Sequence, residues 1–90
     1  LEQNYPNPFN PSTIIRFSIP SVETHRDASL LTSLKVYDVL GNEVVTLVDG
    51  DMNPGIYEVE FNSSNLSSGV YFYKLESDIF IQTRKMILIK

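Results

Sequence analysis

The chain has 90 residues, no cysteine and a formal net charge of −4, a length that suffices for one small domain with a two-layer core. The absence of cysteine excludes a disulfide framework, a thiolate nucleophile and thiolate metal ligands. The acidic balance argues against nucleic acid as a partner, because Lys and Arg side chains supply most of the affinity for phosphates. No apolar run approaches the roughly 20 residues of a transmembrane segment, and no signal peptide pattern is seen.

The chain opens with a proline-rich segment, NYPNPFNPST, which starts at Asn4. Its prolines are Pro6, Pro8 and Pro11. Proline fixes φ and pushes the preceding residue toward an extended conformation, so neither a helix nor a central strand can form here. We predict a stiff lead-in over residues 1–12 that packs on a body formed by residues 13–90. Tyr5 and Phe9 are expected to anchor this lead-in with their rings.

Strand-like alternation of apolar and polar residues follows in several segments. These segments are residues 13–19, 31–39, 43–48, 56–61, 70–76 and 79–90. The pair Gly41 and Asn42 predicts a hairpin turn, and the polar residues 21–29 predict a loop. We expect about seven short strands with a turn signal roughly every ten residues and no helical period. This pattern indicates an all-β fold, an antiparallel β-sandwich.

The segment Asp49–Glu60 is similar to a calcium-binding loop in the spacing of its acids and amides. Such a loop needs glycine at its sixth position, where this chain has Pro54, which cannot adopt positive φ. Glu60 also falls on the outward face of a predicted strand. We therefore predict a plain hairpin turn over Asp49–Gly55 and no metal site.

Other candidate catalytic groups lack partners. The only histidine, His25, lies in a polar loop with no second histidine to help bind a metal. Glu58 and Glu60 share an exposed strand face, where solvated carboxylates are usual, and the serines near Ser63 lack a nucleophile-elbow pattern. We therefore predict no enzymatic activity and no cofactor.

Three consecutive aromatic residues, Tyr71, Phe72 and Tyr73, stand in one predicted strand. Because side chains alternate across a sheet, at least one of these rings must face outward. An outward ring could stack on a sugar or contact a protein partner, or it could cover a hairpin edge or pack under a loop. The residues alone leave these alternatives open.

Four blocks of the sequence resemble one family, the type A C-terminal sorting domain of the type IX (Por) secretion system. They are NYPNPFNPSTIIRFSIP, LKVYDVLGNEV, LSSGVYFYKL and TRKMILIK, in the family's order and approximate spacing. The resemblance covers nearly the whole chain. One departure is the segment Ser21–Ser33, which is longer and more polar than in the shortest members and bears only on a loop.

The resemblance implies an immunoglobulin-like sandwich that acts as a non-catalytic export signal in Bacteroidetes and related bacteria. Such a domain lies at the C-terminus of a longer protein, as we also expect from the first residue, Leu1. An upstream cargo domain is implied to reach the periplasm on its own signal peptide. The outer-membrane translocon then recognises the sorting domain, a sortase-like peptidase removes it in many members, and the cargo becomes surface-bound or extracellular.

Two blocks correspond to the segments that the machinery is thought to recognise. The tail consists of Lys85, Met86, Ile87, Leu88, Ile89 and Lys90, and the second block consists of Gly69, Val70 and Tyr71. We expect the tail to form a terminal strand whose edge can pair with a receptor strand, with the cations orienting the encounter. In the alternative, Ile87 and Ile89 belong to the core and the lysines only solubilise the strand ends.

Two other functions remain open from the residues. An adhesive or carbohydrate-binding sandwich would need an exposed aromatic strip and would bind glycans. A structural spacer of a secreted enzyme would tolerate changes in its terminal strand.

Overall fold

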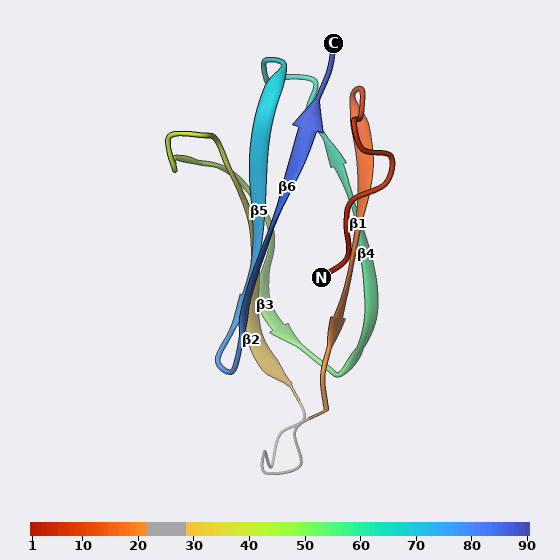
Figure 1. Cartoon of the computed structure of the whole chain (residues 1–90). Coiled ribbons are helices and arrows are strands. Elements are labelled where there is room, and N and C mark those ends of the chain that lie inside the picture. Colours follow the sequence, from red (N-terminus) through yellow and green to blue (C-terminus); the bar gives the residue numbers. More distant parts are fainter. Residues whose placement is uncertain (22–28) are drawn as a thin grey trace.

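The computed structural model describes residues 1–21 and 29–90 and shows six strands (Figure 1). They are β1 (Ser12–Ile19), β2 (Leu30–Tyr37), β3 (Glu43–Met52), β4 (Gly55–Asn62), β5 (Gly69–Ser77) and β6 (Ile81–Leu88). Within these described residues there is no helix that could span a membrane. His25 and most of the predicted loop over residues 21–29 lie outside the described ranges.

The strands form two antiparallel sheets packed face to face (Figure 1). One sheet has the order β1-β4 and the other has the order β3-β2-β5-β6. The predicted all-β sandwich is confirmed, but residues 1–21 and 29–90 contain six strands rather than about seven. The lead-in forms only isolated bridges, at Tyr5 and at Phe9, because its prolines have no N–H to donate to a ladder.

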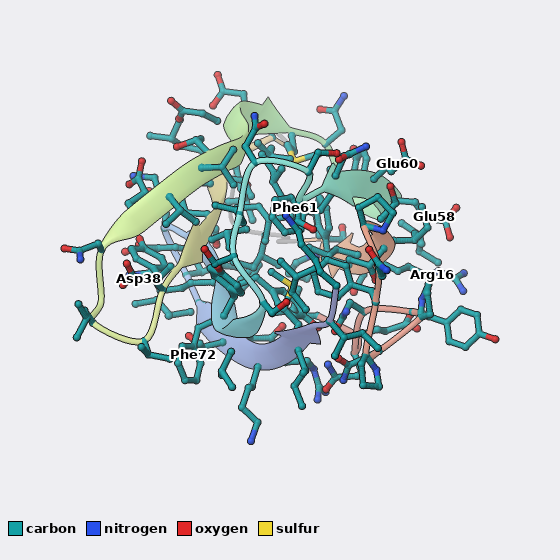
Figure 2. The ribbon with its side chains drawn as sticks, turned by 90° about the horizontal axis from the view of Figure 1, so that it is seen from above. Arg16, Asp38, Glu58, Glu60, Phe61 and Phe72 are labelled. Atoms are coloured by element: carbon teal, nitrogen blue, oxygen red, sulfur yellow. The ribbon has the colours of Figure 1, made fainter. Side chains whose placement is uncertain are left out.

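The core lies between the sheets and follows the alternation of the strands. Ile15, Phe17 and Ile19 of β1 point inward and are almost completely buried, as their period of two predicts. Phe61 of β4 also points into the core, whereas Glu60 beside it points to solvent (Figure 2). The four-stranded sheet contributes a second apolar layer. Its buried members are Leu30, Leu34, Val36, Tyr71, Tyr73, Leu75, Met86 and Leu88.

The segment Asp49–Gly55 differs from its prediction. Asp49–Met52 continues β3 and pairs with β2, and β4 then begins at Gly55 in the other sheet. The connection is therefore a short crossover between sheets at Asn53 and Pro54, and not a hairpin turn. Backbone pairing with β2 outweighs the local turn preference of the Asp-Gly-Asp sequence.

The hairpin turn between β2 and β3 is confirmed at Gly41, which has a φ of +87°. Only glycine adopts this left-handed conformation without a steric penalty. The Asp38 side chain closes the turn by accepting hydrogen bonds from the backbone N–H groups of Leu40 and Asn42, both at 2.9 Å. These bonds lower the pKa of the Asp38 carboxyl below its ordinary value, the bond from Asn42 having the largest effect.

Candidate functional site

The antiparallel pairing of β5 with β6 brings the two predicted recognition blocks together. Gly69 lies opposite Leu88, Val70 opposite Ile87, and Tyr71 opposite Met86. The two blocks therefore form one continuous ribbon at one end of the four-stranded sheet. The C-terminus lies at this end (Figure 1).

Within this ribbon, only some of the predicted residues are accessible to a partner. The side chains of Tyr71, Met86 and Leu88 are buried in the core, so their part in the motif is to hold the strands. The accessible members are Val70 and Ile87, which are half-buried, and Lys85, Ile89 and Lys90, which are exposed. The alternative that places Ile87 and Ile89 in the core is wrong, because Met86 and Leu88 face inward.

The lysines of the ribbon keep their charges available. Among residues 1–21 and 29–90, neither Lys85 nor Lys90 forms an ion pair. The Lys90 ammonium donates a hydrogen bond to the carbonyl of Ser64 at 3.0 Å, which ties the chain end to the loop between β4 and β5. These cations stand out on a chain whose net charge is −4.

β6 is an edge strand of its sheet, as predicted, but the lead-in covers part of its free edge. The Phe9 N–H donates to the Ile87 carbonyl and the Ile89 N–H donates to the Phe9 carbonyl, both at 3.0 Å. The Asn7 side chain accepts a bond from the Ile87 N–H at 3.0 Å, and the Gln3 amide donates to the Lys85 carbonyl at 2.8 Å. The ribbon therefore offers its side chains for recognition, whereas much of the main chain near its C-terminal end is already paired.

The same lead-in is bound to the opposite sheet. Tyr5 and Ile14 of β1 exchange backbone hydrogen bonds at 3.0 and 2.9 Å, and the Glu2 N–H donates to the Arg16 carbonyl at 2.9 Å. Residues 1–9 thus connect β1 of one sheet with β6 of the other, and we call them the strap. The first sheet has only two strands. Because the strap is bonded to both sheets, it closes one side of the sandwich.

The two predicted aromatic anchors of the strap behave differently. Phe9 is buried, with 1% of its surface exposed, and its ring lies 6.0 Å from that of Phe61. Tyr5 is 80% exposed, so the prediction that its ring packs on the body is wrong. Its backbone bonds to Ile14 hold this residue, and the ring points to solvent.

A buried polar pair replaces Tyr5 as the second anchor. The Asn4 N–H donates to the hydroxyl of Tyr73 at 2.8 Å, and this hydroxyl donates to the Glu2 carbonyl at 2.7 Å. The Asn4 amide also donates to the Thr13 hydroxyl at 3.0 Å. Burial raises the pKa of the Tyr73 phenol, while the Asn4 N–H and the charge of Arg84 act in the opposite direction. The anchoring role of Asn4 and Tyr73 has no periodic pattern in the sequence that would reveal it, because the two residues lie 69 positions apart.

Of the three consecutive aromatic residues, Phe72 is the one that faces outward (Figure 2). This confirms the prediction that at least one ring leaves the core. Tyr71 and Tyr73 are buried and donate their hydroxyl protons to backbone carbonyls of Ser67 and Glu2.

The outer face of the other sheet carries charged side chains of both signs. Glu58, Glu60 and Arg16 project from the outer face of the β1–β4 sheet (Figure 2). In the part of the chain that the structure describes, no group of three acidic or histidine side chains is arranged to hold a metal ion.

A comparison with protein-family models matches residues 3–90 to the family described as the secretion system C-terminal sorting domain. The chain belongs to this family. The match begins at Gln3 in the strap and ends at Lys90. The matched region therefore includes both the ribbon and the strap that covers its edge. No curated protein and no solved structure gave a significant match.

Membership identifies the sorting domain as a C-terminal signal of the type IX secretion system. Proteins with such a signal are exported to the cell surface or the extracellular space. The machinery of that system is therefore the partner class of the domain.

Proposed function

We propose that this domain directs an upstream cargo through the outer-membrane translocon of the type IX system and performs no chemistry itself. The match to the sorting-domain family over residues 3–90 carries the proposal. The pairing of Gly69–Tyr71 with the tail supports it, because both recognition blocks then lie in one ribbon. In this proposal the domain folds in the periplasm and presents that ribbon to the translocon.

The recognised groups are the accessible side chains of the ribbon. They are Val70, Lys85, Ile87, Ile89 and Lys90. Branched apolar side chains between two cations fit a receptor groove that is apolar at its centre and acidic at its rim. The charges contribute orientation and encounter rate more than net affinity.

Removal of the domain by a sortase-like peptidase belongs to the same proposal, with cleavage upstream of the strap. The strap is held from its first residue, because the Leu1 carbonyl accepts a hydrogen bond from the Arg84 guanidinium and the Glu2 N–H is bound to β1. A peptidase needs an extended, accessible segment, and well-bonded backbone resists cleavage. The linker before the strap is the segment that meets this need.

A reporter fusion tests the proposal. Residues 1–90 are fused behind a periplasmic reporter in a type IX-competent host, and the surface-exposed fraction is measured by protease accessibility in intact cells. Deleting Ile87–Lys90 is a poor test because it removes the buried Leu88 and the bonds to Phe9. The better variant combines Lys85→Glu with Ile89→Asp, both at exposed positions.

The control combines Arg16→Glu with Ile56→Asp, which makes the same change of charge and polarity at exposed positions on the other sheet. It is the more demanding control, because it also removes the ion pair between Arg16 and Glu2 of the strap. We expect the ribbon variant to retain the reporter in the periplasm and the control to export it normally. Both purified domains should unfold at similar temperatures. Normal export of the ribbon variant would contradict the proposed recognition site and favour a spacer.

A further inference from the structure

The turn between β2 and β3 places two apolar side chains in water. Val39 is 65% exposed and Leu40 is 82% exposed, although they come shortly after the buried residues Leu34 and Val36 of β2. Neither the fold nor the tail explains why two branched apolar residues stand at this position. The turn lies toward the same end of the sandwich as the C-terminus (Figure 1).

The exposure of these side chains is built into a well-bonded turn. The Asp38 N–H donates to the Asn42 carbonyl at 3.0 Å, and the Gly41 N–H donates to the Asp38 carbonyl at 3.1 Å. The Asp38 carboxylate adds bonds from the N–H groups of Leu40 and Asn42. A surface that is held in place before binding loses little conformational entropy when a partner arrives, which favours affinity.

This turn is continuous with the outer face of the four-stranded sheet. Tyr37 lies opposite Phe72, and Phe72 lies opposite Lys85 of the tail. A hollow of about 370 Å³ lies beside the turn. Its lining residues are Tyr37, Asp38, Val39, Gly41, Phe72, Lys74 and Thr83.

The next pair toward the chain end is Val70 with Ile87 on the same face, followed by Ile89. An apolar band therefore crosses the sheet from the turn to the tail. We call it the docking band, and its members are Leu40, Val39, Tyr37, Phe72, Val70, Ile87 and Ile89.

Cations accompany the docking band. The Lys74 ammonium lies 5.1 Å from the centre of the Tyr37 ring and 3.8 Å from the Glu76 carboxylate. Lys85 is opposite Phe72 across the strand pair, and Lys90 is the last residue of the tail. On the opposite sheet, Glu58 and Glu60 are the exposed charges of β4. The four-stranded sheet also carries exposed acids, at Glu43, Asp49, Asp51 and Glu76. Only the tail end of the docking band, at Lys85 and Lys90, therefore offers cations that form no ion pair among residues 1–21 and 29–90.

We propose that the docking band is one continuous surface for a protein partner whose own surface is apolar and carries carboxylates where it meets Lys85 and Lys90, with Val39 and Leu40 as a second anchor across the sheet from the tail. This inference rests on the proposed function and identifies the partner as the receptor of the sorting domain. Aliphatic anchors fit an apolar protein groove better than a sugar, which stacks on aromatic platforms. A second copy of this chain is the other protein occupant that the test below distinguishes.

The test uses the same reporter fusion with Val39→Ser and Leu40→Ser combined. We expect the surface-exposed reporter to fall about tenfold, as removal of interface anchors commonly does. The matched control combines Leu31→Ser with Ile56→Ser, which are 56% and 66% exposed but lie outside the docking band. The control should export within about twofold of the parent domain, and both purified variants should melt within a few degrees of it.

The outcomes separate this inference from the proposed function. Normal export of the turn variant, together with retention of the variant at Lys85 and Ile89, would overturn the second anchor and leave the sorting function standing. Export of both variants would contradict the recognition site as a whole. A parent domain that sediments as a dimer, with the turn variant monomeric, would instead assign the docking band to a second copy. Glycan-array binding lost in the turn variant would assign it to a sugar, and either result overturns the proposal.

Discussion

Replacing Tyr73 by phenylalanine removes the hydroxyl that holds the strap while keeping the ring that fills the core. The Asn4 N–H loses its partner, and Asn4 is only 2% exposed. A buried donor left unsatisfied costs about 1–3 kcal/mol. The lost bond to the Glu2 carbonyl adds about 0.5–1.5 kcal/mol, and a water molecule that binds this carbonyl in the variant recovers part of that cost. We expect a loss of roughly 2 kcal/mol from a domain whose total stability is about 5–15 kcal/mol.

Thermal unfolding and hydrogen exchange measure this effect. For a domain of this size, each kcal/mol corresponds to about 4–8 °C in Tm, so the Tyr73→Phe variant should melt roughly 8–16 °C below the parent. Amide protection at Tyr5 and Phe9 should fall most, because the strap opens first. The matched control is Tyr71→Phe, which removes one local bond to the Ser67 carbonyl and should cost about 1 kcal/mol or less. Equal losses in the two variants, with strap protection unchanged, would refute the reasoning.

The raised pKa of Tyr73 adds a pH dependence. The unfolded chain releases this proton near the ordinary value of 10.0, whereas the folded domain holds it to higher pH. The stabilisation is therefore complete below about pH 10 and is lost as pH rises toward the folded pKa. Urea titrations from pH 8 to 11 should show a steeper loss in the parent than in the Tyr73→Phe variant.

Of three further predictions, one concerns the strap and two concern the turn between β2 and β3. Phe9→Ala should destabilise the domain by about 3–5 kcal/mol in urea unfolding, because a buried ring is removed, whereas Tyr5→Ala at the exposed ring should cost less than about 0.5 kcal/mol. Asp38→Ala should make the free energy of unfolding depend less on pH in the acid range. The pKa of Asp38 is lower in the folded domain than its unfolded value of 3.8, so the carboxylate stabilises the fold above pH 3.8, and this stabilisation is lost as pH falls through the folded pKa. An unchanged pH dependence, followed by circular dichroism, would count against this. Gly41→Ala should destabilise by more than about 1 kcal/mol in the same urea assay, because the turn requires positive φ.

The sequence predicts the core of this fold well where a strand has one buried face. The alternation around Phe17 and around Leu34 correctly identifies inward residues, since a period of two leaves no other register. It fails at Asp49–Met52, where the local composition favours a turn but distant pairing with β2 decides the conformation. The turn preference of a segment depends on its own residues, whereas the stability of a strand depends on partners that are distant in the sequence.

The candidate site is only partly visible in the sequence. The tail and the Gly69 block can be identified, and their pairing follows from the short turn after Ser77. The strap is harder to predict because prolines abolish any period, so nothing distinguishes the buried Phe9 from the exposed Tyr5. The role of Asn4 depends on a tertiary contact with Tyr73, for which a single sequence carries no signal.

The central claim is that this domain is an export signal of the type IX system, and one comparison tests it most directly. The reporter fused to residues 1–90 is expressed in a competent host and in the same host with its outer-membrane translocon deleted. Surface exposure is then measured by protease accessibility in intact cells. We predict exposed reporter in the competent strain and periplasmic reporter in the deletion strain. Equal exposure in both strains, or periplasmic retention in both, would contradict the account.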